Sequence, residues 1–171
     1  NNSLEKANIN EFADLDFKQG LGSLHQSTED IGQYSPEKKF KLIKATGIMR
    51  ETIACLQMLA NELKLPYRVD AIEKILRDSL KRGKQPTMQL LGGITSMMGL
   101  HTSTAKVDPK MGTRLPYPSI ISWENSFAIV KESNVNYLEI VSPSQGIIRL
   151  GKEELVNSFE KGFIELLLVE K

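Results

Sequence analysis

The chain has 171 residues, of which 40% are hydrophobic and 25% are charged, a composition that predicts one globular domain with a sizeable core. Its net charge is +1 and Lys and Arg are interspersed with Asp and Glu, so composition gives no electrostatic reason to expect nucleic acid or an anionic membrane as a partner. A single Cys excludes an intrachain disulfide framework and is typical of a reducing compartment.

The sequence lacks the patterns of a secretion signal, a membrane span and a nucleotide-binding loop. Its first residues have no basic flank followed by an apolar run, so we expect no signal peptide. The longest apolar stretch, residues 163–169, is interrupted by Glu165 and is shorter than the roughly 20 residues that cross a bilayer, which favours a buried strand. Because G-x-x-x-x-G-K-[ST] is missing, this chain itself should not hydrolyse ATP.

The beginning of the chain is more polar than the rest. We interpret residues 1–34 as a linker or extension that contains a short helix around residues 11–18. Residues 35–171 then form the folded domain. Its first element is a helix over residues 51–63, where apolar residues recur with helical spacing, and Pro66 should prevent its continuation.

Two further helices are expected before residue 100. Asp70 and Glu73 have the spacing of a capping box, which predicts a helix that buries apolar side chains of the following turns. Gly83 and Pro86 separate this helix from a third one, which should end near Gly99.

Beyond residue 100 the pattern changes to short β-type runs separated by turn residues. The predicted strands cover residues 101–107, 119–123, 127–131, 137–141, 147–150 and 162–169. Residues 133–134 and 143–146 supply hairpin turns, and a short helix should cover residues 152–159. Helices followed by an antiparallel sheet predict an α+β fold, with N-terminal helices packed on a C-terminal antiparallel β-sheet.

The segment before and within the first helix carries the most informative motif. Residues 51–58 read E-T-I-A-C-L-Q-M. This run resembles the motif of the double-glycine leader peptidases of bacteriocin-exporting ABC transporters, in which a Gln is followed six residues later by C-G-x-A-C-L-x-M. The resemblance implies a papain-like cysteine peptidase fold. It places Glu51 at the position of the nucleophilic Cys, Ala45 at that of the oxyanion-hole Gln, and Cys55 at that of a second, buried Cys.

The resemblance continues in the same order along the chain. Residues 115–123, LPYPSIISW, are similar to the family's L-P-L-P-A-I-x-H-W, and residues 125–130, NSFAIV, are similar to N-H-F-V-V-L. Residues 141–146, VSPSQG, resemble x-D-P-x-x-G. Ser126 therefore matches the general-base His, and Ser142 matches the Asp that orients it.

All four catalytic positions depart from the family pattern, which predicts that the domain is not a protease. A cysteine peptidase needs a thiolate, a neighbouring His and oxyanion donors, and neither Glu51 nor Ser126 supplies the first two. Cys55 should point into the core, one helical turn deeper. His25 and His101 match no catalytic position, and Glu124 is interpreted as a solvated turn residue rather than the second carboxylate of an acid/base pair. We expect no metal site.

The resemblance implies a role in protein export. We expect a catalytically inactive, peptidase-like domain of a bacterial type I secretion or bacteriocin-type ABC exporter, similar to the domain of haemolysin-type systems. This domain would engage unfolded peptide or protein cargo at the cytoplasmic face of the inner membrane. Its partners would be this cargo and the exporter's transmembrane and ATPase domains, the latter holding ATP and Mg²⁺, with no cofactor in this chain. Trp123, Phe127 and Tyr117 are candidate peptide-binding residues, although core packing explains aromatic residues at such positions equally well.

Two alternatives stay open at this point. The domain is a divergent active leader peptidase if the motif alignment above is wrong or if Cys55 is recruited as nucleophile. It is a structural or regulatory module of the transporter if it binds no cargo.

Overall fold

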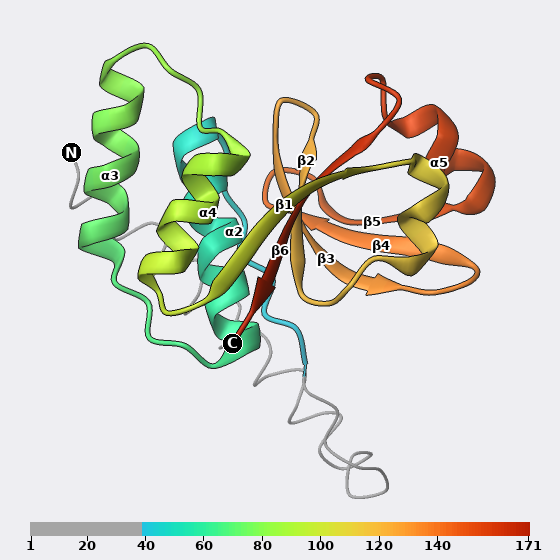
Figure 1. Cartoon of the computed structure of the whole chain (residues 1–171), viewed down its shortest axis with the longest axis horizontal. Helices are drawn as coiled ribbons and strands as arrows, with labels where there is room; N and C mark the ends of the chain where they lie inside the picture. Colours follow the sequence, from blue (N-terminus) through green and yellow to red (C-terminus); the bar gives the residue numbers. More distant parts are fainter. Residues whose placement is uncertain (1–38) are drawn as a thin grey trace, which may run out of the picture.

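The structure is a computed structural model that describes residues 39–171 (Figure 1). The predicted linker over residues 1–34 and its short helix lie outside the described residues. The described part begins with three helices, α2 (Ile48–Leu63), α3 (Val69–Lys81) and α4 (Met88–Met97). The three predicted helices are therefore confirmed, and the first begins three residues earlier than the sequence pattern indicated.

The main helix, α2, is bounded by two residues with positive φ. Gly47 is its N-cap residue with φ of 94°, a conformation that Gly adopts without the steric cost of a Cβ. At the other end, Lys64 is left-handed with φ of 55°, and the N–H of Leu65 donates to the carbonyl of Ala60 at 2.9 Å. This left-handed cap ends the helix before Pro66 is reached.

The capping box predicted for α3 is wrong. Arg68 is the N-cap residue and its side chain makes no capping hydrogen bond. Glu73 is 1% exposed, and one of its carboxylate oxygens lies 3.6 Å from Nη2 of Arg77, one turn further along the helix. The burial pattern of α3 thus brings Glu73 to the buried side, where it is paired within the helix rather than at its end.

The second half of the chain forms one six-stranded antiparallel sheet with the order β1-β6-β2-β3-β4-β5. The strands are β1 (His101–Val107), β2 (Ser119–Trp123), β3 (Ser126–Ser133), β4 (Tyr137–Ser142), β5 (Gly146–Gly151) and β6 (Ile164–Glu170). All six predicted strands are confirmed. The last strand lies between β1 and β2, and a register shift between Val130 and Glu132 marks a bulge in β3.

The sheet separates two hydrophobic cores because alternate strand residues face opposite sides. Ile120, Ile129 and Leu167 face the core shared with α2, α3 and α4. Their neighbours Ile121 and Val130 face a second core. This second core is covered by a 3-10 helix, η1 (Pro109–Arg114), and by α5 (Lys152–Ser158), which lie away from the three N-terminal helices (Figure 1). The fold is α+β, as the sequence predicted.

Candidate functional site at the N-terminus of α2

Glu51 lies in the first turn of α2 and is bonded to the residue that begins the helix. Its Oε2 accepts a hydrogen bond from the N–H of Gly47 at 2.9 Å, and its own N–H donates to the Gly47 carbonyl at 2.8 Å. A carboxylate at this end of a helix is favoured by the helix dipole and satisfies one of the N–H groups that have no partner within the helix. The Glu51 side chain therefore has a structural role in starting α2.

Ala45 connects the segment before α2 to the turn between β4 and β5. It is 6% exposed, and its N–H donates to the carbonyl of Pro143 at 3.0 Å. Its methyl group packs in the core between the helices and the sheet. The Ala45 side chain has no hydrogen-bond donor.

Ser142 ends β4 and closes the hairpin to β5. It is 2% exposed, and its Oγ accepts from the N–H of Gln145 at 3.2 Å. The Oγ atoms of Ser142 and Ser144 are 3.3 Å apart, within hydrogen-bond distance. These contacts are those of a local turn, in which a short hydroxyl side chain satisfies the turn backbone.

Ser126 begins β3, opposite Trp123 of β2. Its Oγ is buried and has no hydrogen-bond partner among residues 39–171. Because Ile129 pairs with Val141, the beginning of β3 and the end of β4 lie at the same end of the sheet. The Ala45 bond to Pro143 brings the segment before α2 to that end as well.

The four motif positions therefore gather where the N-terminus of α2 meets one end of the sheet. We call this set, Ala45, Glu51, Ser126 and Ser142, the degenerate site, because the sequence resemblance predicts that these residues replace catalytic ones. Its functional groups are one carboxylate, two hydroxyls and a methyl group. That set provides no sulfur nucleophile, and neither hydroxyl accepts a proton near neutral pH.

Cys55 lies one helical turn beyond Glu51 and is fully buried, as the helical spacing predicted. Desolvation by burial, and to a smaller degree the charge of Glu51, raises the pKa of its thiol well above the ordinary value. It packs in the core between the helices and the sheet. A thiol in these surroundings is predominantly protonated at neutral pH, whereas the nucleophilic form is the thiolate.

The three candidate peptide-binding residues occupy different surroundings. Trp123 is 7% exposed and its ring contacts that of Phe159 edge to face, with ring centroids 5.7 Å apart. Phe127 is 4% exposed and faces the helical core. Tyr117 is 49% exposed, and its hydroxyl donates to Glu62 of α2. Of the three, Tyr117 is the one that presents a large aromatic surface to solvent.

Gln145 is a residue of this region that sequence reasoning missed. Its Oε1 accepts from Trp123 Nε1 at 3.4 Å, and its amide nitrogen donates to Glu124. Glu124 and Asn125 form the turn between β2 and β3, and both have positive φ. Gln145 therefore joins the β2–β3 turn to the β4–β5 turn beside Ser126. Its position after Pro143 and Ser144 predicts a turn, but these cross-turn bonds depend on a register that sequence alone does not provide.

Neither His is shown at the degenerate site by the residues that the structure describes. His101 is exposed at the start of β1, and His25 lies outside the described residues. Within residues 39–171, no group of three or more His, Cys, Asp and Glu is arranged to hold a metal ion. The same part of the chain has no helix with the length and apolar character of a membrane span.

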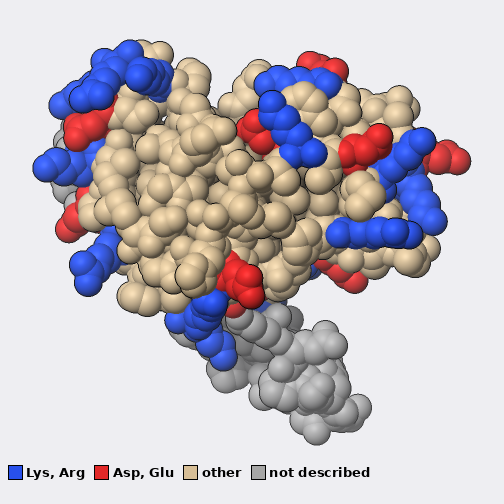
Figure 2. Space-filling view, viewed as in Figure 1, with Lys and Arg blue, Asp and Glu red and all other residues tan. Residues whose placement is uncertain are grey.

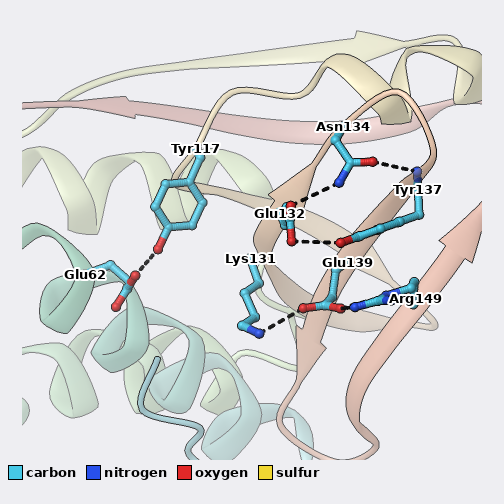
Figure 3. A network of polar contacts seen from close by, with 8 residues as sticks. All are labelled: Glu62, Tyr117, Lys131, Glu132, Asn134, Tyr137, Glu139 and Arg149. Carbon is cyan, nitrogen blue, oxygen red and sulfur yellow. Dashed lines mark hydrogen bonds and ion pairs between the residues drawn. The ribbon is translucent and has the colours of Figure 1, made fainter. Parts of the chain in front are cut away.

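A second polar cluster lies on β3, β4 and β5 (Figure 3). The carboxylate of Glu139 accepts from Lys131 Nζ at 2.9 Å and from Arg149 Nη2 at 2.7 Å. Arg149 also lies over the ring of Tyr137, 4.1 Å from its centroid. Burial acts to raise the pKa of Glu139, but the hydrogen bonds and positive charges of Lys131 and Arg149 outweigh it, so this pKa lies below its ordinary value.

Residues 39–171 match the family model described as the Peptidase C39 family. The chain belongs to this family. The match covers every residue that the structure describes, including all four positions of the degenerate site. No curated protein is similar enough in sequence to match the chain.

Solved structures of C39 peptidase domains share the fold. A double-glycine motif protease from an AMS/PCAT transporter, solved in complex with the leader peptide, has a TM-score of 0.61 and 22% identity, over 77% of this chain and 91% of that chain. The peptidase domain of Streptococcus ComA, a bifunctional ABC transporter of a quorum-sensing pathway, has a TM-score of 0.56 and 19% identity, over 77% of this chain and 98% of that chain. The expected papain-like fold is confirmed.

Proposed function

We propose that this C39 domain is a catalytically inactive part of a type I secretion or bacteriocin-type ABC exporter, and that it engages unfolded peptide or protein cargo. The observation that carries the proposal is the contact between Glu51 and Gly47. At the position where the family motif has its nucleophile, the side chain is a carboxylate that is occupied in capping its own helix. The proposed domain works at the cytoplasmic face of the bacterial inner membrane.

The chemistry of the degenerate site supports the loss of proteolysis. Acyl transfer requires a nucleophile, a base that takes its proton and donors that stabilise the oxyanion. Ser126 and Ser142 replace the base and its orienting group, and Ala45 has no side-chain donor. Losing a nucleophile alone costs several orders of magnitude in rate, by analogy with catalytic triads. Cys55 does not supply the missing thiolate in this conformation, because it is buried and its pKa is raised.

Cargo engagement is supported by the fold and by an accessible aromatic residue. The AMS/PCAT protease with the same fold was solved in complex with the leader peptide, so this scaffold binds a peptide in that protein. An extended peptide is recognised through its backbone and through pockets for alternate side chains. Tyr117 is exposed on the loop before β2 and bonded to Glu62 of α2, so it lies where the sheet meets the helical layer (Figure 3). Trp123 and Phe127 contribute only if the domain rearranges on binding.

The experiment is an NMR titration of the full chain with unfolded secreted peptides encoded near its gene, combined with mass spectrometry of the same samples. We expect shifts centred on Tyr117 and the degenerate site, with every peptide intact. Tyr117→Ala should weaken binding about five- to ten-fold, the loss of one exposed aromatic contact. Val135→Ala, a change at another exposed apolar residue in the β3–β4 turn, is the matched control.

Each alternative has its own signature in that experiment. Peptide fragments that disappear in the Cys55→Ser variant would establish an active peptidase. If all peptides stay intact and none of them changes the chemical shifts of the domain, the result would favour a structural or regulatory module of the transporter.

A further inference from the structure

The positive charge of the described domain is concentrated in its helical layer. Residues 39–100 contain eleven Lys and Arg and five Asp and Glu, whereas residues 101–171 contain eight and nine. The whole-chain net charge of +1 conceals this difference because residues 1–38 contain three Lys and Arg and seven Asp and Glu. The overall composition therefore gives no reason to expect an anionic partner. The distribution of charge along the chain does give such a reason.

One basic region lies where α3 ends and the loop to α4 begins. Residues 81–85 are five consecutive exposed residues, three of which are Lys81, Arg82 and Lys84. Figure 2 shows Lys and Arg side chains gathered over this end of the helical layer, at the upper left. We call these three residues the basic tip. None of them forms an ion pair with another residue of 39–171.

The surroundings of the basic tip distinguish it from a peptide-binding groove. The exposed large hydrophobic residues of the described chain are Met97, Met111, Tyr117, Val135, Ile147 and Val156. None belongs to α3 or to the loop that follows it, so the tip offers no apolar anchor for side chains of a peptide. A protruding, exposed group of cations without an apolar pocket instead fits a broad, diffuse anionic surface.

We propose that the basic tip contacts the anionic lipid headgroups of the inner leaflet, orienting the domain against the membrane. This inference rests on the proposed function, which places the domain beside a bilayer. Each Lys or Arg held near an anionic leaflet strengthens binding about five-fold, and the attraction extends over roughly one Debye length. Three cations make the contact weak and reversible, sufficient to orient a domain that its parent exporter already holds at the membrane.

The test uses vesicles of phosphatidylcholine, alone or mixed with phosphatidylglycerol, and measures co-sedimentation of the full 171-residue chain. We expect binding only to the mixed vesicles and release at high salt. The variant Lys81→Gln/Arg82→Gln/Lys84→Gln should bind about 100-fold more weakly. Its matched control is Lys110→Gln/Arg114→Gln/Lys152→Gln, which removes the same charge from exposed residues on η1 and α5.

Three results would overturn the inference. These are absence of binding to mixed vesicles, an equal loss in the two triple variants, and stronger binding of the wild type to polyglutamate than to mixed vesicles. Vesicle binding is also compared in phosphate and chloride buffers of equal ionic strength. Free phosphate would block a discrete phosphate site, so weaker vesicle binding in phosphate than in chloride would indicate such a site rather than a headgroup-binding surface. The cargo titration of the basic-tip variant separates this inference from the proposed function: cargo binding should be unchanged when vesicle binding is lost.

Discussion

Oε2 of Glu51 lies 2.9 Å from the backbone nitrogen of Gly47 and accepts its N–H, so the Glu51 carboxylate closes the first turn of its own helix. Removing the carboxylate leaves that N–H without its partner and removes a negative charge from the N-terminus of α2. We expect Glu51→Ala to lower the free energy of unfolding by about 1 kcal/mol. Urea denaturation followed by circular dichroism measures it, with Glu160→Ala, at an exposed residue outside the helices, as the control. An unchanged or higher stability would contradict the capping role.

Restoring the motif should restore chemistry if the degenerate site retains the family geometry. We expect the variant Ala45→Gln/Glu51→Cys/Ser126→His/Ser142→Asp to cleave a double-glycine leader peptide, and the wild type and Glu51→Cys alone to show no cleavage. The reason is that a thiolate needs its base and oxyanion donors in place together. Mass spectrometry of the peptide provides the readout. Cleavage by the wild type would refute inactivity directly.

Cys55 should be unreactive in the folded protein. Its thiol is fully buried and its pKa is raised, so both access and thiolate concentration are low. Iodoacetamide at pH 8 should leave the native chain unlabelled and label it fully in urea, as measured by intact mass. Rapid labelling of the native chain would show that Cys55 becomes accessible and would favour the active-peptidase alternative.

Substitution of Cys55 separates packing from catalysis. We expect Cys55→Ser to destabilise the domain by about 1–3 kcal/mol, because it places a hydroxyl in an apolar core. Cargo binding by the folded fraction should not change. Thermal unfolding and the peptide titration, performed on the same preparation, give both quantities.

The Glu139 cluster gives the domain a pH dependence with a definite sign. Because Lys131 and Arg149 lower the pKa of Glu139 below its ordinary value of 4.5, this carboxylate is more acidic when the protein is folded than when it is unfolded. Its stabilising contribution is therefore complete above about pH 4.5 and is lost as the pH falls through the lower, folded-state pKa. Glu139→Gln should flatten the pH dependence of urea unfolding in that acidic range. A wild-type slope retained in the variant would assign the effect to other carboxylates.

Gly112 and Gly93 differ in the space available for an added methyl group. A Cβ on Gly112 of η1 would lie 2.7 Å from Cδ2 of Leu155, which is itself buried in the second core. We expect Gly112→Ala to cost about 1–3 kcal/mol, since a well-packed core resists an added methyl group. Gly93→Ala in α4 meets nothing within 4 Å and should stabilise the domain by about 0.5–1 kcal/mol. Opposite signs in thermal denaturation are the diagnostic result.

The sequence predicted elements most accurately where one local pattern determines them. Residues 101–107 and 119–123 are strands over the ranges that alternation and turn residues indicated. It failed where tertiary burial competes with a local motif, as at Glu73, which has capping-box spacing but packs toward the core. The short 3-10 helix η1 was also missed, because such a turn lacks a repeating apolar pattern.

The same difference between local patterns and tertiary contacts applies to the degenerate site. Motif spacing predicts that Glu51 and Ser126 stand at catalytic positions, and this stays a prediction. Helical periodicity predicted the burial of Cys55, which is confirmed. The bonds of Gln145 to Trp123 and Glu124 join two turns that are far apart in the chain, and no local signal predicts a pair of that kind. Likewise, the alternation of β3 indicates that Phe127 faces one side of the sheet, but not which side is covered by helices.

The strand order has a consequence for how the chain assembles during synthesis. β6 is made last, yet it pairs with β1 on one side and with β2 on the other. Until β6 emerges from the ribosome, β1 has no partner strand among residues 39–171, and one edge of the apolar strand β2 is open. The ribosome must therefore synthesise β6 before the sheet can close. A nascent chain that stops earlier would keep this open strand edge, which chaperones would be expected to bind.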